Sequence, residues 1–132
     1  MPRSLLTLSI LILSFAASPT FAEVLPDSVI GIWDTSTSRC EVPGTSITKI
    51  EIAEDMILTF GGDAIVRDIV RTGPITYIAA DFLQIEGQAE IGLRERTYFR
   101  FTQREGPDQL NVVWKDVFIV DLVRCNDAPG RN

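Results

Sequence analysis

The chain contains no histidine among its 132 residues. This absence removes the side chain that most often transfers protons near neutral pH, the base of a Ser-His-Asp triad and the nitrogen ligand of most zinc sites. The 18 acidic residues are scattered, and no spacing among them selects a pair for glycoside hydrolysis. The sequence also lacks an aspartate-rich calcium loop and a glycine-rich phosphate loop. We therefore expect no enzyme activity, no metal site and no cofactor.

Two cysteines, Cys40 and Cys125, stand 85 positions apart. A redox-active pair is usually a closely spaced C-x-x-C motif with a lowered thiol pKa, which this spacing does not match. In an exported chain, two cysteines normally pair because the compartment oxidises thiols. We expect such a disulfide, with two free thiols or pairing between chains as the alternatives. Closing a loop of this length stabilises a fold by about 4 to 5 kcal/mol in the chain-entropy model, so the bridge is expected to be structural.

The first 22 residues have the pattern of a cleavable secretory signal. A basic residue, Arg3, precedes an apolar run from Leu5 to Ala17 that three hydroxyl residues interrupt. Thr20 and Ala22 then occupy the −3 and −1 positions, where signal peptidase requires small side chains. We expect cleavage after Ala22. Cleavage after Ala16 and an uncleaved membrane anchor are the alternatives, although a span needs about 20 apolar residues.

The predicted mature chain, residues 23–132, is long enough for one β domain with one core. Arg3 is the only charged residue in 1–22, so the mature chain carries a net charge of −7, against −6 for the whole chain. Nucleic acid is not an expected partner, because binding it requires clustered cations. We expect a periplasmic or secreted protein that is not embedded in the membrane after cleavage.

Short apolar runs alternate with turn residues through the mature chain. We expect strands at 31–35, 46–52, 56–60, 64–72, 75–85, 97–102, 110–114 and 117–125, preceded by a helical turn within 25–30. Such a series of strands with short connections predicts an all-β fold. A small antiparallel up-and-down barrel of about eight strands is favoured because closure leaves no open edge, and a β-sandwich is the alternative.

The run from Ala64 to Thr72 also fits a helix, because its four aliphatic residues recur at helical spacing. Those four residues are all β-branched, which favours a strand: Ile65, Val66, Ile69 and Val70. The last run is apolar on both faces and broken only by Asp121. Its outer face therefore needs a cover, for which we consider the turn containing Val29 and Ile30, a partner protein or a second copy.

A tripeptide at the head of the first strand, Gly31-Ile32-Trp33, resembles the G-x-W signature of lipocalin-like barrels. In that family an arginine near the end of the last strand packs across the tryptophan, and Arg124 occupies the corresponding place. The resemblance spans about residues 25–125 and implies that Arg124 covers Trp33, a contact worth about 0.5 to 2 kcal/mol. First and last strands are neighbours in such a barrel, so the resemblance also implies that Cys40 and Cys125 join them.

The chain is similar in outline to small exported bacterial calycin-type barrels. Some of these are periplasmic inhibitors of metalloproteases, which also show a G-x-W followed by a cysteine. Those inhibitors place their second cysteine much earlier than Cys125, and the T-D-Y-like motif of lipocalins is missing here. The inhibitory activity is therefore not carried over to this chain.

Arginines gather on one face of the run around Tyr98. If that strand is unbroken, the even-numbered face carries Arg94, Arg96, Arg100 and Arg104. This face is a candidate patch for an anionic ligand or partner. Alternatively, Glu86 and Glu90 on the neighbouring run lie opposite it and form ordinary surface ion pairs.

The side chains expected inside the barrel are bulky. They include Ile50, Ile52, Leu58, Phe60, Phe99, Phe101, Trp114 and Phe118. An eight-stranded barrel is barely wide enough for such side chains or for one small ligand. We therefore expect a binding module that acts on a protein partner, as an inhibitor or an envelope interaction protein. A carrier of a small apolar ligand is the alternative.

Overall fold

The computed structural model describes residues 19–22, 24–41, 46–115 and 118–125. Nearly all regular structure in these residues is β-strand, and their only helix is a single turn, α1 (Thr37–Cys40). Nine strands follow one another along the chain: β1 (Thr20–Ala22), β2 (Gly31–Asp34), β3 (Ile50–Ile52), β4 (Met56–Thr59), β5 (Gly62–Thr72), β6 (Ile75–Glu86), β7 (Ala89–Gln103), β8 (Gln109–Trp114) and β9 (Phe118–Arg124).

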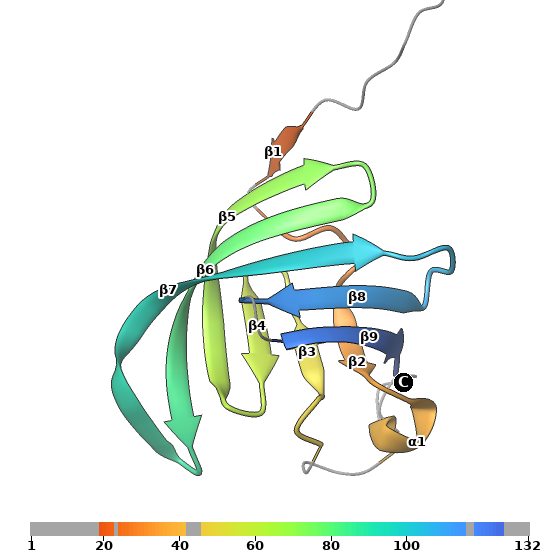
Figure 1. Ribbon diagram of the computed structural model, residues 1–132. Helices are drawn as coiled ribbons and strands as arrows, with labels where there is room; N and C mark the ends of the chain where they lie inside the picture. Colours follow the sequence, from red (N-terminus) through yellow and green to blue (C-terminus); the bar gives the residue numbers. More distant parts are fainter. Residues whose placement is uncertain (1–18, 23, 42–45, 116–117, 126–132) are drawn as a thin grey trace, which may run out of the picture.

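Strands β2 to β9 form a closed barrel, in which each strand is antiparallel to the next and β9 returns to pair with β2 (Figure 1). The expected eight-stranded up-and-down barrel is therefore confirmed. The sandwich alternative is wrong, because the hydrogen-bonded sheet closes on itself. β1 is a ninth strand that pairs with β5 outside the ring. No strand was expected there, since residues 20–22 have the pattern of the end of a signal.

β5 occupies the segment that also fitted a helix, and the preference for a strand is confirmed. It pairs with β6 along its whole length, with one irregularity between Val66 and Asp68. β-Branched side chains restrict χ1 and pack well on a pleated surface, which explains why the helical spacing did not decide the structure. Ile69, for example, is only 1% exposed.

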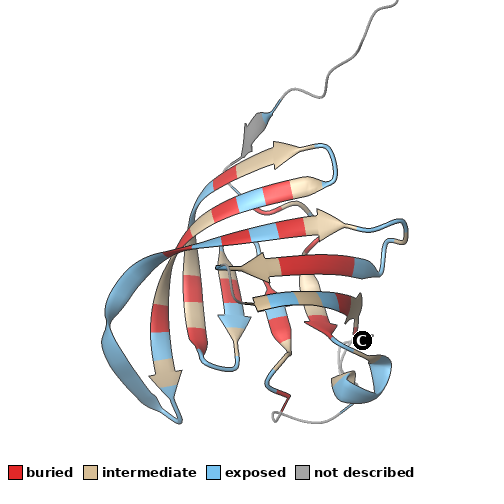
Figure 2. Ribbon diagram, in the orientation of Figure 1, coloured by how far each residue is buried: buried red, intermediate tan, exposed pale blue. Residues whose placement is uncertain are grey.

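Apolar side chains fill the barrel, and the outer wall carries the charged residues together with some exposed apolar side chains. Figure 2 shows buried residues along the barrel strands and exposed residues over the far ends of β6 and β7. The most deeply buried residues of the strands include Trp33, Ile50, Ile52, Ile57, Ile69, Ile78, Phe99, Phe101, Leu110, Val112 and Leu122. Phe99 also stacks on Trp114, with ring centroids 5.2 Å apart.

Two of the expected interior residues point outward. Leu58 is 37% exposed and Phe60 is 62% exposed, whereas Ile57 is fully buried. β4 is only four residues long, and three consecutive apolar residues do not define which alternate set faces the core. Its pairing with β3, which places Ile57 opposite Ile52, sets that choice.

The turn before β2 covers one end of the barrel. The sequence had suggested that this turn covers the outer face of β9, which it does not. Val29 donates its backbone N–H to the carbonyl of Pro26, and Leu25 and Val29 are 1% and 2% exposed. Trp33 donates its indole N–H to the carbonyl of Val29 over 2.8 Å. The outer face of β9 stays uncovered at Ile119, which is 69% exposed.

The expected disulfide is present between Cys40 in α1 and Cys125 after β9, with Cα atoms 5.4 Å apart. The backbone N–H of Cys125 donates to the carbonyl of Ile32 in β2, so the bridge lies beside the junction of the first and last barrel strands. A disulfide of this kind is typical of proteins from oxidising compartments. No helix among the described residues has the length and apolar character to cross a membrane.

Candidate functional site

Arg124 is the centre of the closed end of the barrel. Its guanidinium carbon lies 4.2 Å from the ring centroid of Trp33, as the lipocalin-like pattern implies. Nη1 donates to the carbonyl of Ile30 at 2.6 Å, and Nη2 donates to the carbonyl of Ser28 at 2.9 Å. Nε donates to the Asp108 carboxylate in the β7–β8 loop at 3.1 Å. With all these groups engaged, Arg124 serves to hold the barrel end together.

Gly31 allows this close approach. Its φ of +140° is rare for residues with a side chain, and an added Cβ would lie 2.7 Å from Nη1 of Arg124. A side chain at the first residue of the G-x-W tripeptide would therefore strain the backbone and displace the guanidinium that covers the third residue.

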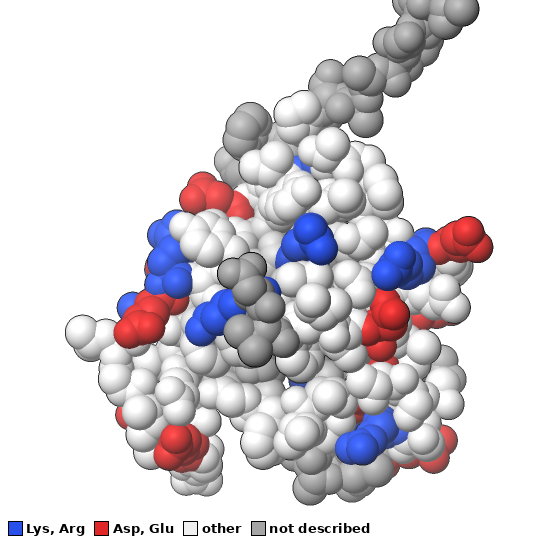
Figure 3. Space-filling view, viewed as in Figure 1, with Lys and Arg blue, Asp and Glu red and all other residues white. Residues whose placement is uncertain are grey.

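The expected arginine patch is occupied by carboxylates from the same wall. Arg94 pairs with Asp63 at 2.7 Å, and Arg96 pairs with Asp81 at 2.8 Å. Hydrogen bonds from Arg67 and Arg96 hold the pKa of Asp81 below its usual range. Arg100 lies on the same strand, opposite Tyr77 on β6. The acids that pair with Arg94 and Arg96 therefore come from β5 and β6, whereas the sequence had pointed to Glu86 and Glu90. Figure 3 shows blue and red side chains close together on this wall.

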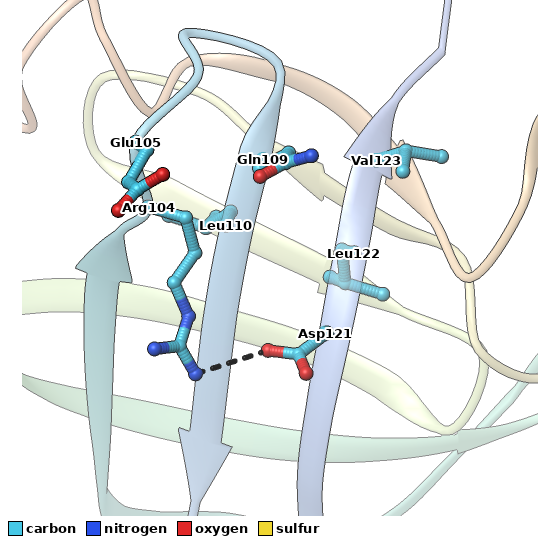
Figure 4. Close-up of a pocket in the computed structure, with 7 residues that line it drawn as sticks. All are labelled: Arg104, Glu105, Gln109, Leu110, Asp121, Leu122 and Val123. Atoms are coloured by element: carbon cyan, nitrogen blue, oxygen red, sulfur yellow. Dashed lines mark hydrogen bonds and ion pairs between the residues drawn. The ribbon is translucent and has the colours of Figure 1, made fainter.

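A second group of polar residues borders an open hollow of about 430 Å³ on the outer wall (Figure 4). Arg104 and Asp121 face each other across it at 3.3 Å, from the end of β7 and from β9. Asn111 donates to the same carboxylate at 2.9 Å, and this bond, with that of Arg104, lowers the pKa of Asp121. The Arg104 and Asp121 charges of this hollow are therefore already paired with each other.

Asp34 is the one fully buried acid among the described residues. Burial raises its pKa, but hydrogen bonds from Thr48, Ser46 and the backbone of Thr35 outweigh burial and lower it overall. The Thr48 hydroxyl donates at 2.6 Å, and the Thr35 N–H donates at 2.8 Å, both to Oδ1. These bonds tie β2 to the segment before β3, which is a structural role.

The far ends of β6 and β7 form a long hairpin, which we call the ribbon and define as residues 83–97, and Figure 1 shows it curving away at the lower left. β6 still pairs with β5 as far as Gln84, so within the ribbon it is β7 that lacks a second neighbour. β7 pairs with β8 only from Phe99 onward. From Ala89 to Thr97, the side of β7 that faces away from β6 therefore has no paired strand among the described residues. Three residues, Gly92 to Arg94, oppose Leu83 alone, which makes a bulge near the middle of the ribbon.

The ribbon exposes apolar side chains. Leu93 is 87% exposed and Ile91 is 42% exposed. Both border a hollow of about 290 Å³ between the ribbon and the mouth of the barrel, together with Thr97 and Lys115. On the face shown in Figure 3, the projecting end of the ribbon is mostly uncharged.

An aromatic cluster forms the mouth of the barrel next to this hollow. Trp114 is its centre, with the ring centroids of Phe82 and Phe118 at 4.9 and 6.4 Å. Its indole N–H donates to the Thr97 hydroxyl at 2.8 Å, and the Lys115 ammonium lies 5.5 Å from its ring centroid. The mouth is therefore packed, and the exposed apolar side chains that border the hollow beside it, Ile91 and Leu93, lie on the ribbon.

Sequence reasoning did not identify the ribbon as a site. Its signal was the apolar pair Ile91 and Leu93, flanking Gly92 within an otherwise charged stretch. We expected a strand only at 97–102, with the arginine face conditional on its continuing back to Arg94, so this stretch did not stand out as part of a ribbon.

The described residues contain no group of three or more potential metal-ligating side chains from Cys, Asp and Glu. The chain matches no protein-family model, no curated protein and no solved structure in the three comparisons made with known proteins.

Proposed function

We propose that this protein is an exported, lipocalin-like binding module that recognises a protein partner through the β6–β7 ribbon. The observation that carries the proposal is Leu93, which is 87% exposed on a ribbon that projects from a filled barrel. Burying one such leucine side chain in an interface contributes about 1.5 to 3 kcal/mol. The proposal includes cleavage after Ala22 and a periplasmic or secreted location, which the signal-like N-terminus and the disulfide support.

A protein partner fits the ribbon better than a small ligand does. Residues such as Trp33, Phe99 and Phe101, each at most 2% exposed, occupy the interior in which a carried ligand would lie. The hollow beside the ribbon, at about 290 Å³, is at the lower limit of the roughly 300 to 1,000 Å³ of small-molecule sites and is open on one side. A flat or convex partner surface can bury Leu93 and Ile91 together.

The test compares two charge substitutions on exposed apolar residues. Leu93→Glu lies on the ribbon, and Ile119→Glu lies on the outer face of β9, where the native side chain is 69% exposed. Tagged full-length chains are exported, and proteins of the envelope and culture fluid are captured on them. We expect a stoichiometric partner that Leu93→Glu loses and Ile119→Glu retains, with unchanged melting temperatures for both variants. Equal capture by the two variants contradicts the ribbon as the binding surface.

The carrier alternative is tested separately by a thermal-shift screen with fatty acids and phospholipids. A ligand at 100 times its dissociation constant stabilises a fold by about 2.7 kcal/mol. We expect no such shift. A lipid that raises the melting temperature by the corresponding amount, and whose effect Trp114→Ala removes, supports the carrier function instead.

A further inference from the structure

β1 shows that the barrel wall accepts an added strand. Its three residues run antiparallel to β5, with Thr20 opposite Arg71, Phe21 opposite Val70 and Ala22 opposite Ile69. Figure 1 places β1 at the top, beside β5 and outside the ring. The chain itself therefore demonstrates the direction and register in which an extended segment fits this wall.

The edge that receives β1 is open for a topological reason. β4 is much shorter than β5 and pairs with it only as far as Ile65. One further bond, from the N–H of Val66 to the carbonyl of Asp55 at 2.8 Å, ends that contact. From Asp68 to Thr72, β5 has β6 on one side and, among the described residues, only β1 on the other. Unpaired edges of this kind are templates for another strand.

The last residue of β1 is also the last residue of the proposed signal. Ala22 pairs with Ile69 and occupies the −1 position of the expected cut. We propose that cleavage during export removes β1 and opens the edge of β5 from Asp68 to Thr72 as a strand-addition site for an extended segment of the protein partner. This inference rests on the proposed export and cleavage, and it makes the edge available only in the processed chain.

Charge on the edge selects the segment that fits. Continuing the register of β1 by one residue places the next position of an added strand opposite Asp68. The Asp68 side chain is 77% exposed, and its ion pair with Arg96 is long, at 3.8 Å. In this chain the residue after Ala22 is Glu23, which has the same sign as Asp68. Directly opposed like charges disfavour strand pairing and opposite charges favour it. The partner segment is therefore extended and carries lysine or arginine at this position.

The first experiment determines the cut and the exposure of the edge. The exported chain is purified, its N-terminus is read from the intact mass, and amide hydrogen exchange is followed by mass spectrometry. The processed wild type is compared with the Ala22→Tyr variant, in which the proposed cut is blocked. This variant retains residues 20–22 whether the signal is cut after Ala16 or left uncut. We expect amides within 68–72 to exchange about tenfold faster in the processed wild type, with equal exchange at 99–103, where β7 lies between β6 and β8.

The second experiment supplies a strand. Two synthetic peptides, Ser-Pro-Thr-Phe-Ala-Lys and Ser-Pro-Thr-Phe-Ala-Glu, are added to the processed chain. We expect the lysine peptide to slow exchange at 68–72 at a severalfold lower concentration than the glutamate peptide, and Asp68→Asn to remove that difference.

The outcomes separate the inference from the function on which it rests. A mature chain that begins upstream of Thr20 overturns both the proposed cut and the inference. A cut after Ala22 with unchanged exchange at 68–72, or with protection from neither peptide, overturns the inference alone. Self-association that protects 68–72 in the processed chain also overturns it, because a second copy then occupies the edge.

Discussion

The guanidinium of Arg124 stacks on the indole of Trp33, with 4.2 Å between the guanidinium carbon and the ring centroid, although the two residues are 91 positions apart in the sequence. The two residues are also direct partners in the pairing of β2 with β9. The same guanidinium bonds to the carbonyls of Ser28 and Ile30 in the turn that covers the barrel end. One side chain therefore links the first strand, the last strand and the end turn.

Replacing this arginine is expected to lower stability markedly. Arg124→Ala removes the contact with Trp33, removes the donor to the carbonyl of Ile30, and leaves the carbonyl of Ser28 with the longer bond from the Gln103 side-chain amide at 3.4 Å. We expect a loss of about 2 to 3 kcal/mol in the free energy of unfolding, measured by urea denaturation. Arg104→Ala is the control, because Arg104 is half exposed and bonds only to exposed Asp121, which predicts a loss below about 1 kcal/mol. Equal losses in the two variants would show that the barrel end does not depend on Arg124.

The adjacent glycines of the β4–β5 turn make a matched pair. Gly62 has a φ of +154°, and an added Cβ would overlap the carbonyl oxygen of Leu83. Gly61 has open space at the same point. We expect Gly62→Ala to lower the free energy of unfolding by about 2 kcal/mol or more, and Gly61→Ala to change it by less than about 0.5 kcal/mol. Thermal and urea denaturation of both variants measure the difference, and its absence would contradict the pairing of β5 with β6 at this turn.

The hydrogen bond from Thr48 to Asp34 is expected to make stability depend on pH. Because the pKa of Asp34 is lowered in the folded chain, its stabilisation is complete above the unfolded value of about 4 and is lost as pH falls through the folded value. Thr48→Val should therefore cost about 1.5 to 3 kcal/mol at pH 6 and clearly less at pH 2.5. Thr59→Val is the control, since the Thr59 hydroxyl donates to the carbonyl of Gly62, which does not titrate. Urea midpoints across this range test the prediction, and a cost of Thr48→Val that is independent of pH contradicts it.

The all-β class and the barrel followed from local features of the sequence. Alternating apolar runs, turn residues between them and the paired signals of Trp33 and Arg124 agree with one another, and the closed sheet with β9 beside β2 follows the same pattern. The disulfide was likewise expected from cysteine count and the signal-like N-terminus. These features depend on backbone propensity and on residue type, which act over a few neighbouring residues.

Strand lengths and the surface that they leave open depended on tertiary structure. Leu58 and Phe60 face outward because the register with β3 sets the orientation of β4, and a slip by one residue exchanges the two faces. β7 continues past the end of β8, which exposes Leu93 on the ribbon, and β5 continues past the end of β4, which opens the edge at Ile69. The length of one strand relative to its neighbour is a property of the pairing of distant segments. The sequence by itself therefore determined the all-β class and favoured closure into a barrel, and only the tertiary structure excluded a sandwich and decided where that barrel is incomplete.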